Sequence, residues 1–188
     1  MILETLICST NNNDEVNVAP FGIQKKKDII VISPYLPSKT HENLLQNKFA
    51  TVNHTDDAGL FVNCFLKKKK FKLAKCQLID SFFLRDALSY HEIEVIDYKK
   101  DKLRPSFFCK SLFFRNSAPF LGFNRARNAL LEACILASRI KILKKDKIVQ
   151  ELNYLAIAIE KTSGPKESSL WRDINIFIVN EMKKYGKN

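Results

Sequence analysis

The sequence predicts an α+β protein in which a strand-rich first part is followed by a helical tail. In the first part, short apolar segments alternate with turn residues, a pattern typical of an antiparallel barrel or sandwich. From Asn124 onward, the apolar residues recur at helical spacing instead. Pro119 and Gly122 interrupt both patterns, so we expect a barrel domain over residues 1–118 and a helical subdomain over residues 119–188.

The strands of the first part are predicted from their apolar, β-branched and aromatic content. The polar run at residues 11–14, Asn-Asn-Asn-Asp, predicts a turn that joins the first two strands into a hairpin. The predicted strands cover residues 2–9, 16–23, 29–34, 49–54, 72–80, 89–98 and 105–114.

Four helices are expected. A short helix is predicted over residues 38–45, where a proline precedes serine and threonine caps. A long helix begins at Asn124, and Asp146 is expected to cap the next helix, which ends at the Gly-Pro pair of residues 164–165. The last helix is predicted over residues 167–185.

The chain has a formal net charge of +11, which is compatible with a surface that binds nucleic acid. Its lysines fall in short blocks where the hydrophobic pattern breaks, and no RNP motif, zinc finger or helix-turn-helix accompanies them. We therefore favour solvated loops over a nucleic-acid partner, with a basic nucleic-acid-binding barrel as an alternative. The blocks are residues 25–27, 67–70, 99–102 and 144–147.

Neither a membrane segment nor a metal site is predicted. The sequence has no apolar run of the roughly 18 residues that a membrane helix needs, and its start does not resemble a signal peptide, so we expect a cytoplasmic protein. The cysteines lack a CxxC pair or a Cys/His cluster, which argues against a zinc site and a disulfide framework. Cys8, Cys64, Cys76, Cys109 and Cys134 are expected to be small core residues.

The first candidate binding segment interrupts the second predicted strand and contains Asn17, Ala19, Pro20 and Gly22. Proline removes a donor from a strand ladder, and glycine lets a ligand or another backbone approach closely. A β-bulge without a ligand explains the same residues, so both interpretations stay open.

The second candidate segment places Ser38, Lys39, Thr40 and Asn43 at the start of the short helix. Exposed backbone N–H groups and the positive end of the helix dipole make this a natural site for phosphate. Hydroxyl capping alone would also explain Ser38 or Thr40, and Lys39 favours the anion.

The third candidate segment is the polar run Asn-His-Thr-Asp-Asp at residues 53–57. It could hydrogen-bond the rim of a heterocycle, or form a turn built from Asx and Thr side chains. No serine or cysteine nucleophile stands in a recognisable motif beside His54, so we interpret this histidine as structural or exposed.

Two arginines open the first long helix. Arg125 and Arg127 are suited to bidentate recognition of phosphate. The favoured alternative is that they pair with Glu132 and other surface acids.

Taken in order, these segments resemble a family of FMN-binding split β-barrel proteins of archaea and some bacteria, whose function is uncharacterised. A more distant similarity extends to the flavin reductase-like and pyridoxamine-phosphate-oxidase-like split barrels. The family resemblance spans nearly the whole chain and rests on Ile2-Leu-Glu-Thr-Leu-Ile, Asn17-x-Ala-Pro-x-Gly22, Pro34-x-x-x-Ser38-x-Thr40-x-x-Asn43-Leu44, Val52-Asn-x-Thr-Asp-Asp57, Pro119-Phe-Leu-Gly-Phe-Asn-Arg-Ala126 and Glu160-Lys-Thr-x-Gly-Pro165.

The resemblance implies an FMN-binding split β-barrel followed by a C-terminal helical subdomain. It also implies a homodimer with one FMN per subunit near the subunit interface. By the same resemblance, Ser38, Lys39 and Thr40 hold the phosphate, Asn43 fixes the turn, Asn17, Ala19, Pro20 and Gly22 line the isoalloxazine, Asn53 and Thr55 hydrogen-bond its polar edge, and Arg125 reaches the phosphate or the partner subunit.

The sequence departs from the family pattern at a few positions. Phe21 stands where the family often has methionine, and His41 stands where tyrosine is common. After Asp57 the chain reads Ala-Gly-Leu-Phe instead of an unbroken apolar run. By the resemblance, these positions line the wall of the flavin-binding groove. The differences therefore affect the expected second substrate more than the expected binding of the flavin.

The resemblance favours a flavin-dependent oxidoreductase. Bound FMN would carry the chemistry, so no catalytic triad or acid pair is required of the protein. A small-molecule electron donor and acceptor are then the expected partners, and a non-catalytic flavin-binding protein is the alternative.

Overall fold

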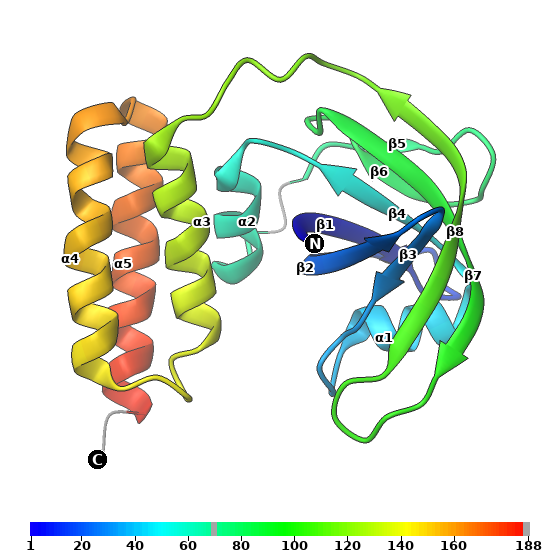
Figure 1. Ribbon diagram of the computed structural model, residues 1–188, viewed down its shortest axis with the longest axis horizontal. Coiled ribbons are helices and arrows are strands. Elements are labelled where there is room, and N and C mark those ends of the chain that lie inside the picture. The colour runs from blue at the N-terminus through cyan, green and yellow to red at the C-terminus, as the bar shows by residue number, and fades with distance from the viewer. Residues whose placement is uncertain (69–70, 186–188) are drawn as a thin grey trace. The chain divides into compact units, whose positions relative to one another are not determined.

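A computed structural model describes residues 1–68 and 71–185 of the chain. The chain divides into two compact units. Met1–Thr55 and Phe71–Phe120 form the first, which we call the barrel unit, and Asp56–Lys70 and Leu121–Asn188 form the second, the helical unit. Figure 1 shows the strands gathered in the barrel unit and a set of packed helices in the helical unit. The predicted α+β class is confirmed.

Six strands close the barrel by antiparallel pairing. Their order around it is β1 (Ile2–Thr10), β2 (Val16–Lys26), β3 (Ile29–Ile32), β8 (Ser106–Asn116), β7 (Ser89–Lys99) and β4 (Phe49–His54). Ile7 of β1 lies opposite Ala19 on one side and Val52 on the other. The buried core of the barrel contains Ile7 and Val52, and it also includes Leu44 of the short helix α1 (Lys39–Gln46). Helix α1 therefore packs against one end of the barrel (Figure 1).

The hairpin of β1 and β2 is confirmed together with its turn. The Asn11 side-chain carbonyl accepts hydrogen bonds from the backbone N–H groups of Asn13 at 2.9 Å and Glu15 at 3.0 Å. Asp14 adopts a positive φ of 60°, which Asn and Asp tolerate better than most residues. The Asx chemistry of the turn therefore fixes the register of the first two strands.

The predicted strand over residues 72–80 is wrong beyond its start. Only β5 (Leu73–Lys75) is extended there, and it pairs with β6 (Phe82–Leu84) in a small separate hairpin. The intervening backbone instead turns toward the carboxylate of Glu92 on β7, which is fully buried. This carboxylate accepts N–H groups from Gln77 at 2.6 Å, Leu78 at 2.8 Å and Ile79 at 3.1 Å. A buried charge needs such donors, and they take this segment out of a strand.

The described part of the helical unit contains α2 (Ala58–Phe65), α3 (Arg125–Ser138), α4 (Lys145–Thr162) and α5 (Pro165–Tyr185). The last three match predicted helices. Helix α2 was not predicted, because its short apolar run shows no helical period and contains Gly59. The Asp57 side chain caps it by accepting the Gly59 N–H, and its first five residues are buried.

The division into units differs from the predicted boundary at residues 118 and 119. The chain passes into the C-terminal helices near that point, at residues 120 and 121, but the helical unit also includes Asp56–Lys70. This inserted segment brings α2 against α3 and α5 (Figure 1). Sequence order alone does not reveal an insertion whose partners lie more than 60 residues away.

Two details of the helix ends also differ from expectation. The N-cap of α4 is Lys144, without a side-chain cap hydrogen bond, so the prediction that Asp146 is the cap is wrong. Asp146 lies in the first turn, where its negative charge favours the helix dipole. Pro165 starts α5, a position at which proline costs a helix no hydrogen bond.

The lysine blocks follow the expected turns in part. Residues 25–27 and 99–102 lie at the β2–β3 and β7–β8 turns, whereas residues 144–147 open α4. In the block at 67–70, residues 69 and 70 lie outside the described residues.

Three of the cysteines, Cys8, Cys109 and Cys134, are buried. Burial raises the pKa of Cys64, Cys76, Cys109 and Cys134 to about 12, which suits small packing residues better than nucleophiles. Within residues 1–68 and 71–185, His, Cys, Asp and Glu side chains form no group of three that could hold a metal ion. None of the helices in this part of the chain is long and apolar enough to cross a membrane.

Candidate functional site

The start of α1 presents backbone N–H groups that precede the helical ladder. Ser38 is the N-cap, and its hydroxyl accepts the His41 N–H at 3.4 Å. The first intrahelical bond runs from the Glu42 N–H to the Ser38 carbonyl, so the N–H groups of Lys39 and Thr40 precede the helical ladder. The Lys39 side chain is exposed. The helix start therefore combines two N–H groups, a dipole end and an ammonium group, all of which suit an anion.

The structure brings two of the candidate segments together at this helix start. The Asn17 side-chain amide on β2 donates to the Thr40 hydroxyl oxygen at 3.0 Å. Thr40 is only 1% exposed, so its hydroxyl packs between β2 and α1. The hydroxyl oxygen of Thr40 accepts this bond and keeps its own proton to donate, and its predicted contact with phosphate stays a prediction.

Asn43 anchors the same helix from the inside. Its side-chain amide donates to the Ser9 carbonyl at 3.2 Å and to the Ser9 hydroxyl at 3.1 Å, and the residue is buried. These bonds tie α1 to β1. The expected role of Asn43 in fixing the turn stays a prediction.

The candidate segment on β2 lies along an edge of the barrel. β2 pairs with β1 along nearly its whole length, whereas its register with β3 covers Gln24 to Lys26. Residues 16–23 therefore extend beyond the β2–β3 ladder. Pro20 suits such an edge because it has no N–H to donate. Ala19 lies on the same half-buried stretch.

Gly22 has a structural explanation within the sheet. A Cβ at this position would stand 2.9 Å from Cγ2 of Ile2 and 3.2 Å from Oε1 of Glu4. Both side chains belong to the neighbouring strand β1, so crowding accounts for the glycine without a ligand.

The structure commits the side chain of Asn53 to the barrel. Asn53 is fully buried, its amide nitrogen donates to the Leu6 carbonyl at 3.0 Å, and its oxygen accepts the Leu84 N–H at 2.8 Å. This geometry makes Asn53 a link between β1, β4 and β6, and its predicted contact with a flavin edge stays a prediction. Thr55 follows β4 and is half-buried, and its predicted flavin contact stays a prediction.

Two histidines meet at the end of β4. The ring centroids of His54 and His91 are 5.5 Å apart, and His91 Nδ1 lies 2.8 Å from the Ser111 hydroxyl. Burial, followed by the charge of Lys25, lowers the pKa of His54. Burial, helped by His54 and Lys25, lowers the pKa of His91 to about 4. Both rings are therefore neutral at pH 7.

We expect His91 to make the protein less stable in mild acid. The unfolded chain takes up this proton near pH 6.5, whereas the folded chain resists it down to about pH 4. The contribution is therefore complete above pH 6.5 and is lost as the pH falls toward 4. It amounts to about 1–2 kcal/mol, because the half-exposed ring is partly screened by solvent. Urea titrations at pH 7 and 4.5 should show a smaller pH effect in His91→Gln than in the wild type. An equal effect in both proteins would contradict this.

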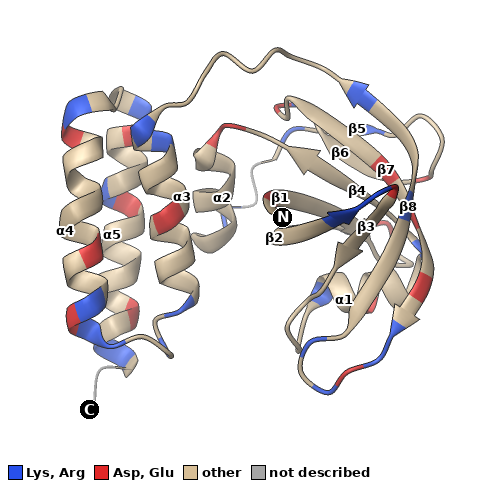
Figure 2. Cartoon of the chain, in the orientation of Figure 1, with Lys and Arg blue, Asp and Glu red and all other residues tan. Residues whose placement is uncertain are grey.

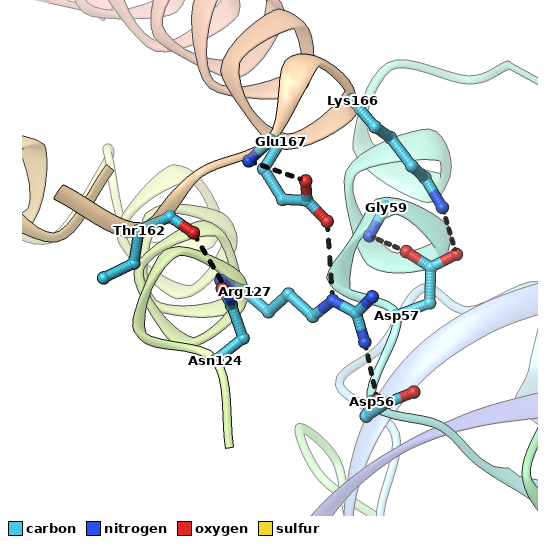
Figure 3. Close-up of polar contacts among 9 residues, drawn as sticks. Asp56, Asp57, Gly59, Asn124, Arg127, Thr162, Lys166 and Glu167 are labelled. Atoms are coloured by element: carbon cyan, nitrogen blue, oxygen red, sulfur yellow. Dashed lines mark hydrogen bonds and ion pairs between the residues drawn. The ribbon is translucent and has the colours of Figure 1, made fainter. Parts of the chain in front are cut away.

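The two arginines of α3 behave differently. Arg127 pairs with Asp56 at 2.6 Å and with Glu167 at 3.4 Å (Figure 3). Its predicted pairing with acids is thus confirmed, although the partners are not Glu132. Arg125 is the exposed first residue of α3, and its predicted contact with a phosphate stays a prediction.

Figure 3 also shows the polar contacts that join the ends of the helices in the helical unit. Asn124 caps α3 through the Arg127 N–H and donates to the Thr162 carbonyl at the end of α4. Lys166 of α5 binds the Asp57 carboxylate at 2.7 Å. Three of the six family motifs therefore meet in one structural network. Their partners are distant in the chain, so the sequence predicts them only as separate segments.

One feature of the barrel unit beside α1 was also missed. Arg104, in the β7–β8 turn, packs its guanidinium over the ring of Tyr35 at 4.7 Å and donates to the Ser33 carbonyl at 3.2 Å. Figure 2 shows basic residues along this turn. The lysine block at 99–102 was the available signal, and we interpreted it only as a solvated loop.

Comparisons with known proteins agree with this fold. The N-terminal domain model of DUF447, a protein family of unknown function, matches residues 3–113, and the C-terminal DUF447 model matches residues 124–176. An FMN-bound protein of the same family from Methanosarcina mazei has a similar structure, with a TM-score of 0.78, 23% identity and 94% of each chain covered.

Other similar structures match a smaller share of this chain. A 2-nitrobenzoate 2-nitroreductase from Pseudomonas fluorescens has a TM-score of 0.53 and 18% identity, over 60% of this chain and 64% of its own. A flavin reductase candidate from Haemophilus somnus also has a TM-score of 0.53, with 13% identity over 61% of this chain and 80% of its own. These likenesses confirm the predicted split β-barrel fold.

Proposed function

This chain belongs to the DUF447 family, and we propose that it is a cytoplasmic flavoprotein whose barrel unit binds FMN. The FMN-bound family member from Methanosarcina mazei supports the proposal. An FMN-binding protein from Thermus thermophilus with the same barrel adds to it, at a TM-score of 0.53 and 12% identity.

The observation that carries the proposal is the start of α1. The N–H groups of Lys39 and Thr40 precede the helical ladder, and the exposed Lys39 side chain forms no ion pair within the described residues. A phosphate monoester has the charge and the acceptor oxygens that such a helix start needs. Ser38 shapes the turn, and Asn17 and Asn43 hold the helix against β2 and β1.

The edge of β2 offers a surface for the ring system. Asn17 links this strand directly to the helix start, so a ligand held by its phosphate at α1 can extend along Ala19 and Pro20. Ala19 and Pro20 lie beyond the part of β2 that pairs with β3, and the missing N–H of Pro20 lets a planar ring approach without leaving a backbone donor unsatisfied.

We also propose that the flavoprotein is an oxidoreductase that acts on small molecules as a homodimer. Bound FMN would supply hydride or electron transfer, and the chain would bind it, orient it and limit its exposure to water. The nitroreductase and flavin reductase relatives of the barrel favour this over a storage role.

Sedimentation equilibrium should give about twice the chain mass of 21.7 kDa. FMN-loaded protein should accelerate the oxidation of reduced nicotinamide dinucleotides. A flavin-bound protein without such turnover would be a carrier.

A titration of Lys39→Gln with FMN tests the site. Loss of the ammonium group should weaken FMN binding about 10–30-fold, since a hydrogen bond to a charged group contributes about 1.5–3 kcal/mol and this one is exposed. The quenching of flavin fluorescence gives the dissociation constant.

Lys110→Gln is the matched control for this titration. Lys110 is exposed and lies opposite Ile29 at the start of β3, whereas α1 follows the end of that strand. Its replacement should leave FMN affinity unchanged. Equal affinities of Lys39→Gln and wild type would move the phosphate away from α1.

A further inference from the structure

Arg104 is held in place beside the candidate phosphate site. Its Nε donates to the Ser33 carbonyl at 3.2 Å, and its guanidinium stacks on the Tyr35 ring with 4.7 Å between the guanidinium carbon and the ring centroid. Ser33 and Tyr35 belong to the segment that leads from β3 into α1. Arg104 is thus the basic residue of the turn over residues 99–104 whose side chain is held by contacts with this segment.

The turn that carries Arg104 is fastened next to the start of α1. The Leu36 N–H donates to the Leu103 carbonyl at 3.0 Å, and Ser106 shares a 2.8 Å hydrogen bond with Ser33. Only Pro37 lies between Leu36 and the N-cap Ser38, so the two residues are at most about 7 Å apart along an extended chain. These bonds hold the β7–β8 turn, and with it the exposed Arg104, beside the segment that leads into the helix start.

The charge of Arg104 is available to such an anion. Within the described part of the chain, no carboxylate forms an ion pair with it. The nearest acid in the sequence, Asp101, instead accepts the backbone N–H groups of Arg104 at 2.7 Å and Leu103 at 2.8 Å. Stacking on Tyr35 fixes the guanidinium plane without using all of its donors.

The electrostatics of a phosphate monoester call for a second cation. Such a group carries a charge of about −1.5 to −2 at pH 7, and Lys39 offers a single positive charge. A guanidinium can bind two phosphate oxygens at once, in a fixed plane.

We propose that Arg104 is a second phosphate ligand that completes the FMN site together with Lys39 and the start of α1. The proposal rests on the proposed binding of FMN to the barrel unit. It gives the Tyr35–Arg104 pair a role in ligand selection, in addition to fastening the β7–β8 turn.

The test compares FMN with riboflavin, which lacks the phosphate. Arg104→Gln should weaken FMN binding about tenfold, by the general contribution of a charge-assisted contact, and leave riboflavin binding within about twofold of wild type. Arg104→Lys keeps the charge but loses the planar fork, so its affinity for FMN should lie between those of the wild type and Arg104→Gln. Arg85→Gln, an exposed arginine after β6, should match the wild type.

The outcomes separate this proposal from the one on which it rests. Equal losses for FMN and riboflavin would show that Arg104 only positions the segment before α1, and would overturn the proposal. Unchanged FMN affinity in Arg104→Gln, with tight binding in the wild type, would overturn it and leave the FMN site standing. A wild-type protein without affinity for FMN would overturn both. Should Arg104→Gln fail to fold, the FMN-to-riboflavin ratio of Arg104→Lys decides alone, and a ratio equal to wild type overturns the proposal.

Discussion

Replacing Glu92 with glutamine should lower the free energy of unfolding by about 3–4 kcal/mol. The carboxylate is fully buried and accepts three backbone N–H groups, from Gln77, Leu78 and Ile79. A glutamine amide accepts through its oxygen alone, so its NH₂ group must face at least one of these donors. The variant therefore loses a charge-assisted bond and leaves a buried N–H unsatisfied.

Urea denaturation followed by circular dichroism measures this loss. The matched control is Glu94→Gln, since Glu94 lies two residues further along β7, is half-buried and makes no ion pair within the described residues. Its replacement should change stability by less than about 0.5 kcal/mol. Hydrogen exchange should also show early loss of protection at residues 77–79 in Glu92→Gln. A Glu92→Gln protein as stable as Glu94→Gln would refute the role given to this carboxylate.

Replacing Arg127 with glutamine should destabilise the helical unit by about 2–3 kcal/mol. Arg127 lies between Asp56 and Glu167, whose side chains are 22% and 14% exposed. Removal of the guanidinium leaves both carboxylates partly buried without their partner. The cost is below that of a fully buried pair, because the Arg127 side chain is 37% exposed.

The single tryptophan reports on this unit directly. Trp171 lies in α5, so its fluorescence follows the unfolding of the helices in urea. Arg125→Gln serves as the control because Arg125 is exposed on the same helix, and it should unfold at the wild-type midpoint. Coincident transitions of Arg127→Gln and Arg125→Gln would mean that the network of Figure 3 adds nothing to stability.

The elements that the sequence predicted correctly are those with local signals. The Asx turn at Asn11 sets the first hairpin, and the periodic apolar residues of α3 mark a helix without reference to its partners. Helix α2 escaped prediction because its apolar run is explained only by packing against α3 and α5. The turn over residues 76–81 was not predicted either, because the carboxylate that accepts its backbone N–H groups belongs to Glu92 on a later strand.

The candidate site shows the same division. Ser38 and Lys39 were identified from a local capping pattern, and the structure gives them an exposed helix start. The bond between Asn17 and Thr40 joins two segments that the sequence analysis had predicted separately. The burial of Asn53 could not be predicted from the sequence, because its partners Leu6 and Leu84 are 47 and 31 residues away in the chain.

The central claim is that the barrel unit recognises FMN by its phosphate at the start of α1. Isothermal titration calorimetry of the wild-type protein with FMN, and separately with riboflavin, measures this recognition. We predict one FMN bound per chain, with riboflavin at least about tenfold weaker, the loss expected when a phosphate gives up its charge-assisted bonds. Equal affinity for both ligands, or no heat of binding with FMN, would contradict the claim.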